Sequence, residues 1–217
     1  MGPTIKSTQV INVLDKVGLE EGIQKGKDTI LSGGLVAFPT ESFYGLGVNS
    51  LDERAVKRLF QAKKRKSDQP ILILIPSIES LDQYVQNIPE VAHKLIERFW
   101  PGGLTLIFQA TPNISPLLTA GTGKIGIRLS SHPVAAALVR SVGIPITGTS
   151  ANISGQPPCS SVSQVLESLG QSVDLILDGG STEGKVGSTL LDVTKDPPVI
   201  LRQGMIGRTE IEEFLLS

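Results

Sequence analysis

Short runs of apolar residues alternate along the chain with stretches in which apolar residues recur every three or four positions. The runs predict buried strands, and the recurring pattern predicts helices with one apolar face. We expect eight strands, at residues 35–38, 71–75, 104–108, 125–129, 145–147, 173–177, 189–193 and 199–201. We expect seven helices, at residues 19–31, 52–62, 78–85, 89–99, 133–142, 162–169 and 208–216. This order of elements indicates a layered α/β fold.

The sequence favours one mixed sheet flanked by helices over a strictly parallel sheet. Two predicted helices follow each other between residues 75 and 104, and the last strands are close together in sequence. The glycines after Ser32 are expected to end the first helix. Ser50, three residues before Glu53, fits a capping box at the start of the second. No repeat or linker divides the sequence, so we expect a single domain over residues 1–217 without an appended second domain.

The charge balance and the cysteine content exclude several classes of protein. The 217 residues include 20 basic and 21 acidic side chains, which give a net charge of -1. That balance excludes a general nucleic-acid coat, so any anion site must be local. The single cysteine, Cys159, excludes an internal disulfide framework and a multi-cysteine metal site. No apolar run approaches about 18 residues and residues 1–9 lack a signal-peptide pattern, so we expect a cytoplasmic protein without a membrane segment.

Common catalytic motifs are incomplete in this chain. The segment that ends at Lys124 lacks the earlier glycine of a phosphate-binding loop, and Ile125 replaces the Ser or Thr that would bind magnesium. The segment from Gly148 ends in Asn152, where a nucleophile elbow has Gly. Both histidines lie far from Cys159 in sequence, which favours surface or packing roles for them over a catalytic pair.

Polar clusters remain at the ends of predicted strands, the usual position of ligands in open α/β sheets. The first cluster, residues 39–47, follows the strand at 35–38 and places hydroxyl side chains before two glycines. One interpretation is a helix N-terminus capped by Thr40. The other is a site for an anion, because unpaired backbone N–H groups at such a terminus bind anions.

The second cluster concentrates positive charge. Seven of the chain's 20 basic residues fall between Arg54 and Lys66, with no acidic residue among them. Three of the seven lie on the expected solvent face of the helix at 52–62, as in any amphipathic helix. The other four, at positions 63–66, follow that helix. We expect their side chains to converge on a polyanion such as a nucleoside triphosphate or an RNA backbone.

The third cluster, residues 147–155, comes directly after a strand and contains four hydroxyls, one amide and two glycines. This composition fits a simple turn, and it also supplies neutral donors for a phosphate or a ribose. Arg128 and Arg202 each end an apolar strand, and Ser188 precedes the strand at 189–193. Two interpretations fit each arginine: a charged side chain at the edge of the sheet, or a side chain that contacts a ligand.

Taken in order, these motifs resemble those of one known family. They are Pro39-Thr40-Glu41-Ser-x-Tyr44-Gly45-Leu46-Gly47, Lys63-x-Arg65, Phe99-Trp100-Pro101-Gly102-x-x-Thr105, Ile127-Arg128, Ser150-Ala151-Asn152-x-Ser154-Gly155, Gly187-Ser188-Thr189 and Leu201-Arg202-x-Gly204. The sequence resembles the YrdC/TsaC-type threonylcarbamoyl-AMP synthases over roughly residues 24–207. The Lys-x-Arg motif followed by Ser-x-Asn is the specific part of the match.

The resemblance implies a twisted α/β fold with a wide, positively lined concave surface. It implies an enzyme that forms L-threonylcarbamoyl-AMP and pyrophosphate from L-threonine, bicarbonate and ATP, with Mg²⁺ on the ATP phosphates and no tightly bound cofactor. Downstream transferase proteins would use this product to modify an adenosine of tRNA.

The resemblance also assigns residues to the two substrates. The threonine side comprises Thr40, Arg128, Gly148 and Ser188, and the ATP side comprises Lys63, Arg65, Gln69, Lys124, Ser150, Asn152 and Arg202. Lys63 and Arg65 are assigned to catalysis through their charge, because two anionic reactants must approach each other. We assign no general base.

The sequence departs from the family pattern at a few positions. Lys66 replaces a proline that is common there, Leu74 replaces a histidine of some members, and Lys124 replaces a frequent threonine. Two alternatives remain open: a module that binds double-stranded RNA or tRNA without catalysis, and a carbamoyl-transfer module like the related domain of hydrogenase-maturation proteins. A threonine-dependent adenylate assay separates both from the synthase.

Overall fold

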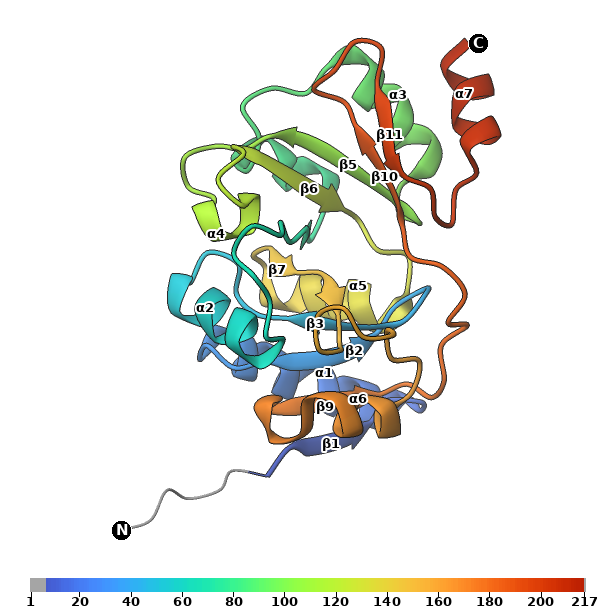
Figure 1. Ribbon diagram of the computed structural model, residues 1–217. Coiled ribbons are helices and arrows are strands. Elements are labelled where there is room, and N and C mark those ends of the chain that lie inside the picture. Colours follow the sequence, from blue (N-terminus) through green and yellow to red (C-terminus); the bar gives the residue numbers. More distant parts are fainter. Residues whose placement is uncertain (1–6, 217) are drawn as a thin grey trace.

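Two mixed β-sheets form the frame of the protein, whose computed structural model describes residues 7–216. The five-stranded sheet lies in the lower half of Figure 1, and the six-stranded sheet lies in the upper half. Helices surround both sheets, as the sequence predicted. The prediction of a single sheet is wrong, because the chain crosses between the sheets at points that the apolar pattern does not mark.

The lower sheet combines parallel and antiparallel pairs. Its strand order is β1 (Gln9–Asn12), β9 (Leu175–Asp178), β2 (Val36–Pro39), β3 (Tyr44–Gly47) and β8 (Thr149–Ser150). The first three strands are parallel, and β3 and β8 are antiparallel to their neighbours. The sequence did not predict β1, β3 and β8. Glycine and serine are unfavourable in strands, so their presence in β3 and β8 weakened the strand signal there.

The upper sheet holds six of the eight predicted strands. Its order is β11 (Val199–Arg202), β10 (Thr189–Asp192), β5 (Leu104–Gln109), β6 (Lys124–Arg128), β4 (Ile73–Leu74) and β7 (Ile146–Thr147). The pairs β10–β5 and β6–β4 are parallel, and the other pairs are antiparallel. All eight predicted strands are present within a few residues, which confirms the mixed α/β architecture.

Seven α-helices and two 3₁₀ helices are present in the described residues. The α-helices are α1 (Lys16–Leu31), α2 (Glu53–Ala62), α3 (Glu90–Phe99), α4 (Pro116–Thr119), α5 (Pro133–Val142), α6 (Val162–Leu169) and α7 (Arg208–Leu216). The helix predicted at 78–85 is the 3₁₀ helix η1 (Ile78–Gln83), and η2 (Gly170–Ser172) and the short α4 were not predicted. One apolar cluster joins α1 and α5 to the lower sheet, and a larger cluster includes apolar residues of both sheets with α2, α3 and α6.

Local capping differs from the sequence-based expectation at two places. Asp52, rather than Ser50, caps α2, because its carboxylate accepts a hydrogen bond from the backbone N–H of Arg54. The Ser50 hydroxyl is buried and donates to the carbonyl of Pro145. Thr40 begins a turn between two antiparallel strands, so the prediction of a helix N-terminus there is wrong. The predicted stop after Ser32 is confirmed by Gly33, whose φ is +81°.

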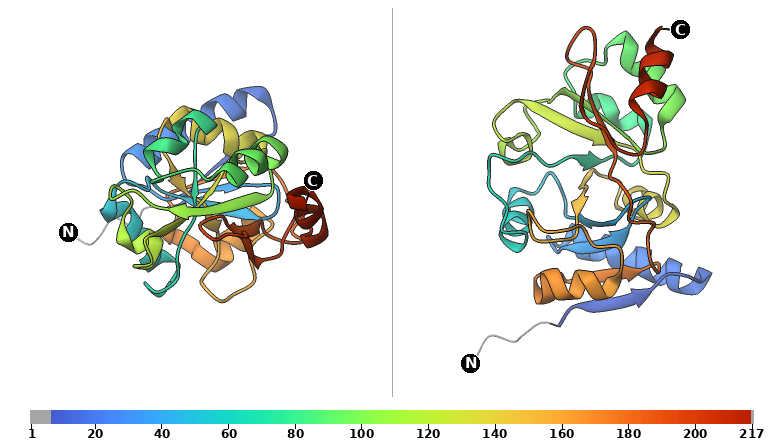
Figure 2. Two further views of the ribbon diagram at one scale, coloured as in Figure 1. Left: turned by 90° about the horizontal axis from the view of Figure 1, so that it is seen from above. Right: turned by 45° about the vertical axis from the view of Figure 1, so that its right-hand side comes forward.

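Gly148 marks one crossing between the sheets. The preceding strand, β7, pairs with β4 of the upper sheet, and the following strand, β8, pairs with β3 of the lower sheet. A Cβ atom on Gly148 would lie 2.6 Å from Leu72 Cδ1, so only glycine fits without displacement. Residues 48–72 connect β3 to β4, and residues 179–188 connect β9 to β10, on the right-hand side of Figure 1 and in the right view of Figure 2. Residues from both sheets therefore meet between them.

Two expectations from the sequence depend partly on residues at the ends of the chain that the structure does not describe. The absence of a signal-peptide pattern at residues 1–9 rests partly on residues 1–6, which lie outside the described residues. The expected domain also includes Ser217, which lies outside them as well. In the described part of the chain, every helix is too short or too polar to cross a membrane.

Candidate active site

An open cavity of about 890 Å³ lies between the two sheets. Its wall includes the β2–β3 turn, the segment after α2, the crossing at Gly148 and the ends of β6, β10 and β11. Eight of the eleven predicted site residues line it, namely Thr40, Arg65, Lys124, Arg128, Gly148, Ser150, Ser188 and Arg202. Lys63, Gln69 and Asn152 are outside its lining. The structure thus brings together most of a site whose members are up to 162 residues apart in sequence (Thr40 to Arg202).

The charged residues of the cavity wall are mostly basic. Five basic residues and one carboxylate line it: Arg65, Lys124, Arg128, Lys185, Arg202 and Asp192. Walls of one sign focus the potential of a cavity and attract ligands of the opposite sign. Within the described part of the chain, Arg65 and Arg202 have no carboxylate partner. Their charges are therefore available to an anion.

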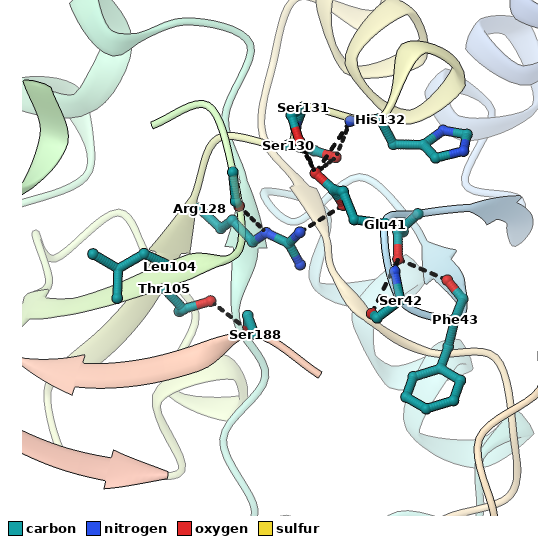
Figure 3. A network of polar contacts seen from close by, with 12 residues as sticks. Glu41, Ser42, Phe43, Leu104, Thr105, Arg128, Ser130, Ser131, His132 and Ser188 are labelled. Atoms are coloured by element: carbon teal, nitrogen blue, oxygen red, sulfur yellow. Dashed lines mark hydrogen bonds and ion pairs between the residues drawn. The ribbon is translucent and has the colours of Figure 1, made fainter. Parts of the chain in front are cut away.

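Arg128 is fixed in the wall by two acceptors (Figure 3). It ends β6 and is buried, with Nη2 donating to Glu41 Oε2 at 2.5 Å and Nε donating to the Gly102 carbonyl at 2.7 Å. The remaining terminal nitrogen projects into the space between Ser42 and Ser188 in Figure 3. A guanidinium has five N–H donors, so Nη1 and one hydrogen of Nη2 remain to bind a carboxylate through two hydrogen bonds.

Glu41 accepts hydrogen bonds from a second segment as well. Its Oε1 accepts from the hydroxyls of Ser130 and Ser131, both at 2.9 Å, and from the backbone N–H of His132 at 3.1 Å. His132 precedes α5 and makes no capping hydrogen bond with its own side chain. Glu41 therefore caps α5 from the β2–β3 turn, and its negative charge is favourable at a helix N-terminus.

The pKa of Glu41 follows from this environment. Burial raises the pKa, but the charge of Arg128 and the hydrogen bonds from Ser130 and Ser131 outweigh burial and hold it below its usual value of 4.5. A lowered pKa in the folded state means that the ionised carboxylate stabilises the fold above about pH 4.5. This contribution is lost as the pH falls through the lower, folded-state pKa.

A pH series is expected to show this contribution. In urea denaturation, the difference in free energy of unfolding between the wild type and Glu41→Gln should be constant above about pH 5 and shrink below pH 4.5. The shrinkage arises because protonation of Glu41 removes the ion pair that the variant already lacks. A difference that stays constant down to pH 3 would contradict the assignment of a lowered pKa to Glu41.

Two hydroxyl groups with defined hydrogen-bond partners line the cavity together with the free guanidinium edge of Arg128. The Thr40 hydroxyl donates to the Phe43 carbonyl at 2.7 Å, and the buried Ser188 hydroxyl is 2.8 Å from that of Thr105. Each oxygen keeps capacity for a further hydrogen bond to a ligand. Because Gly148 has no side chain, the backbone of residues 147–149 can approach a ligand closely. These groups suit a small molecule with a carboxylate and a hydroxyl.

Two further arginines of the cavity wall have defined orientations. Arg65 Nη2 donates to the Pro70 carbonyl at 2.8 Å, and Arg202 Nη2 donates to the Ser188 carbonyl at 2.9 Å. Backbone carbonyls orient these side chains without neutralising them. Lys124 differs, because its ammonium pairs with Asp192 at 2.8 Å. Asp192 therefore partly neutralises the charge of Lys124, and the contact of Lys124 with ATP stays a prediction.

Lys63 requires a correction. Its side chain is only 1% exposed, and Nζ donates to the carbonyls of Ser150 and Asn152, the latter at 2.7 Å. Burial, followed by the charge of Arg65, lowers the pKa of Lys63 to about 7. The expectation that it converges on a polyanion with residues 64–66 is wrong, because the end of α2 directs it into the core. It holds in place the segment that carries Ser150.

The other two predicted residues outside the wall are also accounted for. The Asn152 side-chain amide donates to the carbonyls of Ile153 and Gln156, so it stabilises its own loop. Gln69 is exposed, and its backbone carbonyl accepts a hydrogen bond from Arg65 Nε at 3.2 Å. Neither side chain is part of the cavity lining, and their direct contacts with ATP stay predictions.

Removal of the Lys63 ammonium is expected to destabilise the fold. In Lys63→Met two buried carbonyl groups lose their donor, which should lower the free energy of unfolding by about 2 to 4 kcal/mol in urea denaturation. Lys64→Met is the matched control, because Lys64 is adjacent and exposed. Equal stability of the two variants would contradict a supporting role for Lys63.

Sequence reasoning missed several residues of the site. Glu41, Asp192, Ser130 and Lys185 had no assigned role, although Glu41 belongs to the first polar cluster. Asp192 ends β10, and a carboxylate at the end of an apolar strand was a usable signal. The partners of Glu41 are 87 to 91 residues away along the chain, and no local spacing relates them.

The chain is similar to several known proteins. Residues 28–204 match the Sua5/YciO/YrdC family model, which carries the description "Telomere recombination". The chain is 42% identical over 208 residues to the threonylcarbamoyl-AMP synthase of Pyrococcus abyssi and 44% identical over 182 residues to that of Bacillus subtilis. These matches cover 96% and 83% of this chain. They cover 61% and 53% of the relatives, so the chain spans less than two thirds of their length.

A shorter relative and a solved structure extend the comparison. A putative threonylcarbamoyl-AMP synthase of Mycobacterium tuberculosis is 36% identical over 208 residues, which are 96% of this chain and 95% of the relative. The crystal structure of P. abyssi Sua5 complexed with L-threonine superposes with a TM-score of 0.92 at 42% identity. It matches 96% of this chain and 61% of that one. The fold and the family are thereby shown.

Proposed function

The chain belongs to the Sua5/YciO/YrdC family, and from this premise we propose that it is an L-threonylcarbamoyl-AMP synthase. It forms the adenylate and pyrophosphate from L-threonine, bicarbonate and ATP. The observation that carries the proposal is the cavity itself, in which the free edge of Arg128 and two unpaired arginine charges face one space. Relatives that carry the name of this enzyme support it.

L-Threonine binds beside Arg128. Its carboxylate accepts two hydrogen bonds from Nη1 and Nη2, and its hydroxyl and amine lie near Thr40, Ser188 and the backbone at Gly148. The related P. abyssi protein was crystallised with L-threonine, which supports a threonine site in this fold. Arg128 is paired with Glu41, and its remaining terminal nitrogen faces the space between Ser42 and Ser188.

ATP binds beside threonine in the same cavity. Arg65 and Arg202 contact its phosphates, and Ser150 supplies a neutral donor. The two arginines belong to different parts of the chain, one after α2 and one at the end of β11, so the triphosphate is held from two sides. Planar guanidinium groups match phosphate oxygens better than a point charge does.

The reaction requires two anions to meet. The threonine amine attacks bicarbonate to give a carbamate with loss of water, and a carbamate oxygen then attacks the α-phosphorus of ATP with release of pyrophosphate. Two unit charges 4 Å apart repel by about 4 kcal/mol at an effective dielectric constant of 20, and the cations of the wall reduce that cost. Fixed substrates also gain from proximity, which contributes roughly 7 to 11 kcal/mol at its upper range.

Magnesium would enter with the nucleotide. Mg²⁺ usually keeps several waters and binds through substrate phosphates and one or two carboxylates. No group of three metal-ligating side chains occurs in residues 7–216, and the one carboxylate of the wall, Asp192, is paired with Lys124. This donor set suits a cation held mainly by phosphates and water, which would neutralise charge on the leaving pyrophosphate.

Further properties belong to the same proposal. The adenylate would pass to transferase proteins that modify tRNA, and direct contact with tRNA stays a prediction. Both the cytoplasmic location and the single-domain organisation also remain predictions. Support for the single domain comes from the family match over residues 28–204 and from the length of the M. tuberculosis relative.

A direct assay tests the function. The protein is incubated with ATP, Mg²⁺, bicarbonate and labelled L-threonine, and the products are separated by chromatography. A labelled adenylate and one pyrophosphate per adenylate are expected, and both should require threonine. An RNA-binding module would produce neither. A carbamoyl-transfer module would form an adenylate from carbamoyl phosphate instead, without threonine.

A further inference from the structure

Glu41 lies between the threonine side of the cavity and the start of α5 (Figure 3). We propose that Glu41 is a positioning residue that orients Arg128 and thereby sets the affinity of the site for the amino-acid carboxylate. The inference rests on the proposed function, because it concerns the substrate that Arg128 would bind. Glu41 itself is outside the cavity lining and contacts the ligand only through Arg128.

The first step concerns how firmly Glu41 is held. Its carboxylate accepts from Arg128 on one oxygen and from Ser130, Ser131 and His132 on the other. Two of these contacts come from the backbone N–H groups of residues 131 and 132 at the beginning of α5. Backbone donors have no rotamer freedom, so the carboxylate has one preferred position.

The second step concerns what Arg128 would do without this partner. A long arginine side chain loses roughly 1.5 to 2 kcal/mol of rotamer freedom when it is held in one place. In the structure, Glu41 and the Gly102 carbonyl together define the plane of the guanidinium, since they bind Nη2 and Nε. With Gly102 alone, the plane could rotate about one hydrogen bond, and the two remaining donors would no longer face the cavity together.

The third step separates this role from a general charge effect. Glu41 is 11% exposed and Arg128 is 7% exposed, so their pair is shielded from solvent and contributes little net charge to the cavity. Replacement of Glu41 by Gln adds one positive charge near the site. Charge alone would therefore strengthen the binding of every anion, whereas loss of orientation weakens only the ligand that uses the fork of Arg128.

Calorimetric titration of the full chain measures both ligands separately. For Glu41→Gln, we expect the Kd for L-threonine to rise about ten-fold, which corresponds to roughly 1.4 kcal/mol, and the Kd for Mg-ATP to stay the same or fall. The matched control is Asp174→Asn. Asp174 is a similarly buried carboxylate, with 7% exposure, that pairs with Arg58 at 2.8 Å and is outside the cavity lining. Its variant should lose stability without any change in the Kd for L-threonine.

A second variant covers the case in which Glu41→Gln does not fold. Glu41→Asp keeps the charge but is one methylene shorter, so it cannot reach Arg128 and the start of α5 together, and a smaller rise in the Kd for L-threonine is expected. Equal affinity of the wild type and both folded variants for L-threonine would overturn the inference, as would equal weakening for L-threonine and Mg-ATP. A wild type that binds no L-threonine would instead reject the proposed function.

Discussion

Arg128→Ala is expected to raise the KM for L-threonine by roughly 30-fold to 1000-fold, which corresponds to about 2 to 4 kcal/mol. The reason is that the free edge of the Arg128 guanidinium faces the cavity between Ser42 and Ser188, where the threonine carboxylate is proposed to bind. The KM for ATP should change much less, because Arg65 and Arg202 remain. Steady-state kinetics with each substrate varied in turn measures the two constants.

Arg128→Ala is also expected to destabilise the fold, and this effect must be distinguished from the effect on threonine binding. Truncation of Arg128 leaves the buried Glu41 without its ion-pair partner, and the loss of one partner of a buried pair destabilises by about 3 to 5 kcal/mol. Arg128→Lys keeps a positive charge near Glu41 but removes the planar fork. A KM for L-threonine that is unchanged in the folded Lys variant would show that the fork is not used.

Arg65→Ala is expected to raise the KM for ATP by about 10-fold to 100-fold, because it removes charge-assisted hydrogen bonds to phosphate from a half-buried position. The KM for L-threonine should stay within about two-fold of the wild type, since Arg128 and its partners are untouched. The effect should also decrease at high salt less than that of an exposed lysine, because the cavity is partly shielded from solvent.

Lys66→Ala is the matched control for Arg65→Ala. Lys66 lies in the same basic segment but is exposed and outside the cavity lining. If the whole segment attracted ATP through its summed charge, the two variants would weaken ATP binding by similar factors. The structure predicts that Arg65→Ala has the larger effect by far, and equal effects would contradict the position given to Arg65.

The fold was largely predictable, and its main error has a clear physical origin. Apolar runs mark largely buried strands, so strands such as β5 and β6 were identified within one or two residues. The strand β3 contains two glycines, and β8 has only two residues, so neither carries an apolar pattern. These are the strands that extend the lower sheet, and without them eight strands fit a single sheet.

The sequence predicted which residues line the site better than it predicted the contacts that these residues make. Strand ends and polar clusters identified Thr40, Arg128 and Arg202, all of which line the cavity. The sequence could not indicate that Lys63 points into the core, since burial at the end of a helix depends on the segment packed above it. It also could not indicate the ion pairs of Glu41 and Asp192, because each partner comes from a distant strand.

The cavity takes its wall from both sheets, and the chain passes between them three times, at residues 48–72, at Gly148 and at residues 179–188. Bound threonine and ATP would therefore contact both sheets at once and link them non-covalently. A ligand present at about 100 times its Kd adds roughly 2.7 kcal/mol to the free energy of unfolding. Amide hydrogens in β2, β6 and β10 should then exchange more slowly together, because a ligand that contacts both sheets stabilises both at once.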